Sequence, residues 1–143
     1  MTNKAFIAGV GMIPFAKPGA NAPYPGMAAQ ATRLALADAG VAYDLVQQAY
    51  VGYVYGDSTA GQKALYGVGM TGIPIVNVNN NCSTGSTALF LARQAVESGA
   101  VDCVLALADR PSGWNAQALN TACRSKLIRM LAQRYGTTVR IGR

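Results

Sequence analysis

Short apolar runs alternate with segments of helical spacing along this chain of 143 residues. The apolar runs span residues 5–11, 48–55, 73–78 and 101–108. The segments with helical spacing span 24–39, 62–68 and 83–98, and Gly40 is expected to end the first of these helices. Because helices usually connect parallel strands, this order predicts an α/β fold with a mixed, mostly parallel sheet and helices on both faces. The first run is expected to be a buried strand.

Composition limits the kinds of site that the chain can build. It is 51% hydrophobic and 13% charged, with three cysteines and no histidine. An odd number of cysteines without C-x-x-C spacing argues against a disulfide framework and a zinc site, and favours a reducing compartment. The absence of histidine excludes Ser-His-Asp and Cys-His catalysis by this chain alone. No targeting segment or membrane span is recognisable, so we expect a cytoplasmic protein.

The net charge of +6 comes from one end of the sequence. Residues 1–109 hold five Lys or Arg against six Asp or Glu, whereas 110–143 hold seven basic residues and no acidic one. This contrast predicts a domain over 1–109 and a basic tail over 110–143. Apolar residues of the tail fall roughly on one helical face, typical of helices that bind anionic membranes or acidic partners: Leu119, Ala122, Cys123, Leu127, Ile128, Met130 and Leu131. We favour a solvated basic extension, and we expect no nucleic-acid partner because no nucleic-acid motif accompanies the arginines.

The glycine pattern at residues 67–72 fits G-x-G-x-x-G. It follows a predicted helix and precedes a predicted strand, which is the reverse of the order in dinucleotide-binding folds. We therefore interpret it as a loop rather than a nucleotide site.

The most informative segment is 76–90, which joins an apolar run to a helix through Asn79, Asn80, Asn81 and Cys82. Asparagine suits tight turns, so these three residues are expected to shape the turn. A thiolate at Cys82 would be stabilised by the unpaired N–H groups and the dipole of the following helix. Small side chains would let a flat acyl thioester approach, and others would bury the far face of the helix: Ser83, Thr84, Gly85 and Ser86, then Leu89, Phe90, Ala92 and Ala95.

The alternative is that Cys82 is a small buried apolar residue, as most free cysteines are. Position alone leaves the two readings nearly even. Cys103 lies inside the run 101–108 beside Val104 and is expected to belong to the core. Cys123 lies in the basic tail and supports no inference.

Segment 76–90 resembles the nucleophile segment of thiolases, and the similarity covers residues 4–108 approximately. Three further motifs resemble the thiolase domain of the sterol carrier protein X type: Gly9-Val10-Gly11-Met12, Val51-Gly52-Tyr53-Val54-Tyr55-Gly56-Asp57-Ser58 and Gly69-Met70-Thr71-Gly72-Ile73-Pro74-Ile75. The pair Asp57-Ser58 and the string Asn79-Asn80-Asn81-Cys82 make the resemblance specific to that branch.

The resemblance implies the first half of a thiolase-like fold and a CoA-dependent acyltransferase of lipid and sterol side-chain breakdown. In that reaction Cys82 takes the acyl group of a 3-oxoacyl-CoA and passes it to free CoA, and the N–H of Cys82 is one donor to the thioester oxyanion. Coenzyme A is a co-substrate, no cofactor is permanently bound, no metal is implied, and no residue is assigned to CoA binding. The resemblance also implies a homodimer that pairs around residues 73–80.

The second half of a thiolase supplies histidines, a second reactive cysteine and a glycine-rich loop, and this chain has no histidine. The resemblance therefore implies an incomplete thiolase that is inactive alone. After residue 108 the family continues into a glycine and an acidic loop, but this chain continues with Asp109-Arg110-Pro111-Ser112-Gly113-Trp114. We hypothesise that 110–143 arise from a shifted reading frame or a truncated gene. The alternative function is a non-catalytic remnant that binds through its basic tail.

Overall fold

A computed structural model describes residues 4–14, 20, 22–108 and 125–129 of the chain. The strands are β1 (Phe6–Gly11), β2 (Gln48–Gly52), β3 (Ile75–Val78), β4 (Cys103–Ala108) and β5 (Ser125–Arg129). The α-helices are α1 (Tyr24–Ala39), α2 (Ala60–Leu65) and α3 (Thr84–Glu97). Two short 3-10 helices, η1 (Tyr43–Leu45) and η2 (Asn81–Ser83), precede β2 and α3.

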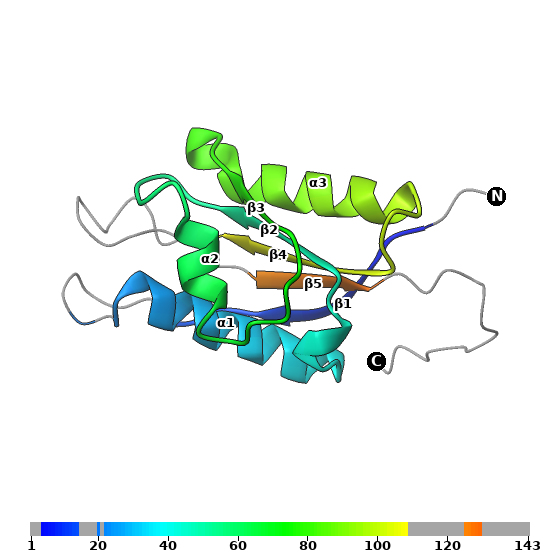
Figure 1. The fold of residues 1–143 in the computed structure, drawn as a ribbon, viewed down its shortest axis with the longest axis horizontal. Helices are drawn as coiled ribbons and strands as arrows, with labels where there is room; N and C mark the ends of the chain where they lie inside the picture. Colours follow the sequence, from blue (N-terminus) through cyan, green and yellow to red (C-terminus); the bar gives the residue numbers. More distant parts are fainter. Residues whose placement is uncertain (1–3, 15–19, 21, 109–124, 130–143) are drawn as a thin grey trace.

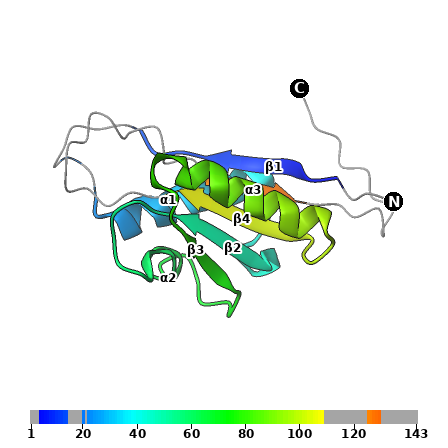
Figure 2. The same cartoon turned by 90° about the horizontal axis from the view of Figure 1, so that it is seen from above.

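The five strands form one mixed sheet in the order β1-β5-β4-β2-β3. Strand β2 pairs in parallel with both β3 and β4, whereas β5 lies antiparallel between β4 and β1. Helices α1 and α2 cover one face of the sheet and α3 covers the other (Figures 1 and 2). The predicted α/β class, with a mostly parallel sheet and helices on both faces, is confirmed.

Helix α1 packs closely on β1 because two glycines of that strand have no side chain. A Cβ atom on Gly9 would lie 2.5 Å from the Ala35 carbonyl oxygen, and one on Gly11 would lie 2.2 Å from that of Ala31. The helix ends at Gly40, which has a left-handed φ of 62° and donates its N–H to the Ala37 carbonyl. Both features agree with the roles expected of glycine at a close approach and at a helix C-cap.

The larger part of the core lies between the sheet and the α1–α2 layer. Leu65 from α2 packs there with Leu105 and Leu107 from β4. A smaller cluster lies under α3, where Ala92 and Val96 contact the opposite side of β4. Strand β4 is therefore buried on both faces, as central parallel strands usually are. Among the described residues, no helix is both long and apolar enough to cross a membrane.

Strand β1 is the main departure from the expected burial pattern. The expected strand is present, but Phe6, Ile7 and Val10 are 50%, 49% and 52% exposed, so the prediction that the strand is buried is wrong for these side chains. The reason is the strand order, because β1 lies at one edge of the sheet and α3 packs over β4 and β2 instead. An apolar run alone does not distinguish a central strand from an edge strand.

One helix position also differs from the prediction. Phe90 was expected to be buried but is 56% exposed, because α3 faces the sheet with residues spaced by four: Thr84, Ala88, Ala92 and Val96. Two residues beyond Ala88, Phe90 lies on the opposite side of the helix. On α1, Met27 and Ala31 are buried, whereas Leu34 is 44% exposed.

Several strands and helices are shorter than the sequence predicted. Strand β2 ends at Gly52 rather than 55, and α2 covers 60–65 rather than 62–68. In the basic tail, residues 125–129 form β5, so the helical pattern drawn through Leu127 and Ile128 is wrong there. The remainder of that pattern, including Cys123, lies outside the described residues. Local residue patterns do not reveal that this segment pairs with both β1 and β4.

Candidate active site

Cys82 lies in η2, between the end of β3 and the start of α3. It is a free cysteine with an exposed side chain. Strands β2, β3 and β4 run in parallel, so their carboxyl ends lie at the same end of the sheet, where α3 begins (Figure 1). Ligands of open α/β sheets bind outside the carboxyl ends of the strands, and Cys82 is at such a position.

The turn before Cys82 is shaped by the three asparagines, as expected. Asn81 has a left-handed φ of 49°, a conformation that asparagine tolerates better than most residues. Its N–H donates to Asn79 Oδ1 at 3.2 Å, and Asn79 Nδ2 donates to the Val54 carbonyl at 3.3 Å. Asn80 Nδ2 donates to Thr87 Oγ1 of α3 at 2.9 Å. These bonds connect the turn to the loop that follows β2 and to α3.

Thr84, the first residue of α3, anchors the helix to the strands. Its buried hydroxyl donates to the Val78 carbonyl at 2.7 Å and lies 3.3 Å from the Tyr53 carbonyl. The same oxygen accepts the N–H of Asn80 at 3.3 Å. One side chain therefore connects the end of β3, the residue after β2 and the turn that carries Cys82.

Two glycine contacts let α3 begin directly against the sheet. A Cβ atom on Gly52, the last residue of β2, would lie 2.7 Å from the Thr84 carbonyl oxygen. A Cβ atom on Gly85 would lie 2.9 Å from the Cβ of Ala108, the last residue of β4. Both distances are shorter than ordinary van der Waals contact, so larger residues would move the helix start and Cys82 with it.

The four small residues that follow Cys82 differ in their exposure to solvent. Ser83 and Ser86 are exposed, Gly85 is half-buried and Thr84 is buried. Ser83, the N-cap residue of α3, makes no side-chain capping bond, and the first turn of the helix holds no acidic residue. Sequence reasoning missed the positioning roles of Gly52 and of the Thr84 hydroxyl. A glycine that ends an apolar run is the signal that could have found the first of them.

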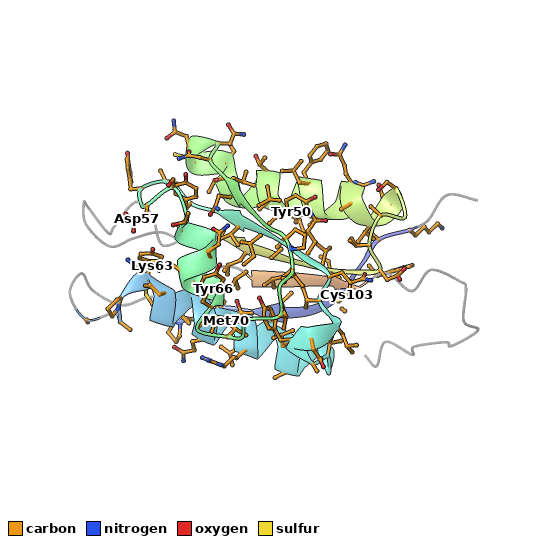
Figure 3. All side chains as sticks on the ribbon, in the orientation of Figure 1. Tyr50, Asp57, Lys63, Tyr66, Met70 and Cys103 are labelled. Atoms are coloured by element: carbon orange, nitrogen blue, oxygen red, sulfur yellow. The ribbon has the colours of Figure 1, made fainter. Side chains whose placement is uncertain are left out.

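Two other features of chemical interest among the described residues are the Asp57–Lys63 pair and Cys103. Asp57 and Lys63 pair with each other at 3.4 Å across an exposed surface near α2, as Figure 3 shows. Cys103 is buried at the start of β4, as predicted, and lies toward the opposite end of the sheet from the start of α3 (Figure 3). No group of three His, Cys, Asp or Glu that could hold a metal occurs within the described ranges. The site thus presents an exposed thiol, and the chain has no imidazole that could act as its base.

A separate hollow of about 370 Å³ lies on the α2 side of the sheet. Its lining comes from η1, α2 and the loop before β3, and does not include Cys82: Tyr43, Gln62, Tyr66, Gly69, Met70, Thr71, Gly72, Ile73 and Ile75. Figure 3 shows Tyr66 and Met70 at its side of the molecule. Burial raises the pKa of the Tyr43 phenol, and a hydrogen bond with the Thr71 side chain partly offsets this rise.

The arrangement of a strand, a polar turn with a cysteine and a docked helix agrees with the family that the sequence resembles. The sequence model of the family described as "Thiolase, N-terminal domain" matches residues 5–140. The chain belongs to the thiolase family. The match continues beyond residue 109 and so includes most of the basic segment that was expected to lie outside the resemblance.

Two relatives are proteins called sterol carrier protein 2. The chain is 63% identical over 109 residues to that of Gallus gallus, which covers 75% of this chain and 20% of the relative. It is 51% identical over 142 residues to that of Bos taurus, which covers 95% of this chain and 26% of the relative. The chain therefore spans about a quarter or less of the length of these thiolase-family relatives.

Comparison with solved structures agrees with the fold of this thiolase-family chain. The priming β-ketosynthase of the R1128 polyketide biosynthetic pathway matches with a TM-score of 0.72 at 17% sequence identity. The match covers 90% of this chain and 51% of the ketosynthase. At this identity the likeness establishes the shared fold alone.

Proposed function

We propose that this thiolase-family chain is an acyltransferase fragment in which Cys82 accepts an acyl group from a CoA thioester. The observation that carries the proposal is the exposed sulfur of Cys82 at the start of α3, beside the carboxyl ends of three parallel strands. The substrate class is 3-oxoacyl-CoA, with free CoA as the second acceptor and lipid or sterol side-chain breakdown as the setting. No permanently bound cofactor is required for this chemistry.

The full reaction would break the bond between C2 and C3 of the 3-oxoacyl-CoA. The Cys82 thiolate attacks C3, the acyl group stays on sulfur as a thioester, and acetyl-CoA leaves after its C2 carbanion takes a proton. Free CoA then attacks the Cys82 thioester and releases the shortened acyl-CoA. The chain has no histidine to supply or remove these protons, and losing even one oxyanion donor commonly lowers rates by about a hundredfold to a thousandfold. We therefore expect no turnover by the chain alone.

The exchange of an acyl group between two sulfur atoms is less demanding. Cys82 thiolate attacks the thioester carbonyl of an acyl-CoA, and CoA thiolate leaves with its sulfur–carbon electron pair. No carbon–hydrogen or carbon–carbon bond is made or broken. This half-reaction is the one that a lone activated cysteine can carry out.

Mass spectrometry of the full chain after incubation with acetyl-CoA or a longer acyl-CoA tests this proposal. The expected result is one acyl group, mapped by peptide digestion to Cys82, that added CoA removes. A Cys82→Ala variant serves as the matched control, and Cys123→Ala removes the second thiol of uncertain reactivity. Absence of an adduct on Cys82 would favour the alternative of a non-catalytic remnant that acts through its basic segment.

We also propose a homodimer that pairs around residues 73–80, in the cytoplasm and without a nucleic-acid partner. Support comes from β3, which lies at the edge of the sheet opposite β1 and carries an exposed Val76. Nearby, Met70 is 83% exposed. Light scattering after gel filtration is expected to show a dimer that Val76→Lys weakens, whereas Phe90→Lys on the outer side of α3 leaves it unchanged. A monomeric wild-type chain would contradict the pairing.

The reading-frame origin of residues 110–143 stays a prediction, and the family match through residue 140 counts against it. Translating the coding DNA downstream in all three frames is expected to reveal the missing thiolase half. Its absence from every frame would exclude a frameshift.

A further inference from the structure

Among the residues that the structure describes, β1 has one edge with no neighbouring strand, and that edge is suited to pairing with another strand. It is the outermost strand on its side of the sheet, and its only strand partner among the described residues is β5. Its sequence from Phe6 to Gly11 is uncharged, and the apolar side chains of Phe6, Ile7 and Val10 are about half exposed. Long apolar edges of this kind are templates for edge-to-edge association.

One peptide group of this edge is already occupied by a side chain. The backbone N–H of Val10 donates to Asp38 Oδ2 at 2.8 Å, a contact between residues 28 positions apart. Asp38 lies near the end of α1, which packs against β1 through the two glycine contacts described above. Because the Val10 N–H donates to the Asp38 side chain of α1, we assign it to the outer edge of the sheet, away from β5.

We propose that Asp38 keeps the outer edge of β1 from accepting a further strand, namely β1 of a second copy of this chain. An incoming strand would need the Val10 N–H as a donor for one of its carbonyls. It would therefore have to break a hydrogen bond to a charged acceptor, and its carbonyl oxygen would approach the Asp38 carboxylate. The side chains of β1 bring no like charges together when two copies of the strand pair, since the strand is uncharged.

Two further features act in the same direction. The pairing of β1 with β5 shifts register between Ile7 and Gly9, and such irregularities disturb the regular spacing that an added strand needs. Lys4, just before the strand, is exposed and charged. On the opposite edge, a neutral side chain has a comparable position, because Gln62 Nε2 donates to the Ile75 carbonyl at 3.2 Å. A carboxylate at β1 therefore opposes strand addition more strongly than the amide at β3.

The inference is independent of the chemistry at Cys82 and of pairing at β3, since β1 and β3 lie at opposite edges of the sheet. Association through β1 would add to a β3 dimer and produce species larger than a dimer. The two kinds of association are therefore distinguishable by size.

The test compares Asp38→Ala with Asp44→Ala in the full chain. Asp44 is an exposed acid in η1, so its substitution removes the same charge at a site outside α1 and β1. Sedimentation or light scattering over a concentration series is expected to show that Asp38→Ala forms species larger than those of the wild type. The apparent constant for self-association is expected to rise by about tenfold or more, because the substitution removes a charged hydrogen-bond acceptor. Asp44→Ala is expected to behave as the wild type.

A second substitution shows whether the association uses the strand edge. Val10→Pro removes the N–H that an added strand requires, and proline is tolerated on an edge strand whose N–H faces outward. The Asp38→Ala/Val10→Pro double variant is expected to return to the wild-type size. Equal association of the Asp38→Ala and Asp44→Ala variants, or association that Val10→Pro does not reverse, would overturn the proposal.

Circular dichroism establishes that each variant is folded before its size is compared. If Asp38→Ala does not fold, Asp38→Glu keeps the charge but displaces the carboxylate by one methylene group. That variant is expected to self-associate more strongly than the wild type but less strongly than Asp38→Ala. A folded Asp38→Glu chain of wild-type size at every concentration would also count against the proposal.

Discussion

Replacing Gly52 by alanine tests the contact that sets the position of Cys82. The added Cβ atom would lie 2.7 Å from the Thr84 carbonyl oxygen, 2.9 Å from its carbonyl carbon and 3.1 Å from its Cγ2. Two of these atoms belong to the backbone at the start of α3, so a rotamer change cannot relieve the contact. The helix start has to move away from β2 by several tenths of an ångström, and the turn containing Cys82 moves with it.

The magnitude follows from two contributions. Overpacking against a rigid backbone costs about 1–3 kcal/mol, and weakening the bond from the Thr84 hydroxyl to the Val78 carbonyl adds about 1 kcal/mol. The Gly52→Ala variant is therefore expected to lower the free energy of unfolding by about 2–4 kcal/mol. Urea denaturation followed by circular dichroism measures this quantity. The rate of Cys82 alkylation by iodoacetamide, in a Cys123→Ser background, reports the accompanying change at the site.

Gly67→Ala is the matched control. A Cβ atom on Gly67 would find its nearest neighbours at 3.7 Å, an ordinary contact distance, so its free energy of unfolding is expected to change by less than about 0.5 kcal/mol. If Gly52→Ala is no less stable than Gly67→Ala and its Cys82 reacts at the wild-type rate, the close approach of β2 to α3 does not control the site.

Two other predictions concern backbone strain and pH. Asn81→Ala is expected to lower the free energy of unfolding by about 1 kcal/mol, because alanine is poorly suited to a left-handed φ of 49°; urea titration should find Asn81→Gly closer to the wild type. Burial raises the pKa of Tyr43 above its ordinary value of 10.0, so folding favours the neutral phenol and this contribution to stability is lost as the pH rises above 10. Thermal denaturation across alkaline pH is expected to show a smaller loss for Tyr43→Phe than for the wild type, and identical slopes would refute the assignment.

Local sequence patterns were sufficient for much of the secondary structure. The alternation of apolar runs and helical spacing predicted each strand and α-helix from β1 to β4, although β2 and α2 are shorter than expected. Gly40 ends α1 as predicted because a left-handed residue at a helix C-terminus favours glycine strongly. Cys82 lies in the turn between β3 and α3, since asparagine-rich segments interrupt strands for local reasons.

Burial at the edges of the fold was less predictable. Phe6 and Phe90 are both large and apolar, and both are exposed, because their environment depends on which elements pack beside them. The residues 125–129 were drawn as part of a helical face but pair as β5 between two other strands. Such pairing is decided by backbone hydrogen bonds with distant segments, which single-residue propensities do not report.

The sequence by itself determined the alternation of strands and helices, the location of a cysteine at a strand-to-helix turn, and the absence of imidazole chemistry. These properties depend on residue identity or on spacings of two to four residues, which local backbone geometry converts directly into structure. The tertiary structure decided that β1 is an edge, that Gly52 touches Thr84 and that Asp38 binds the Val10 N–H. Each of these depends on contacts between segments far apart in the chain, whose geometry exists only after the sheet and its helices have packed.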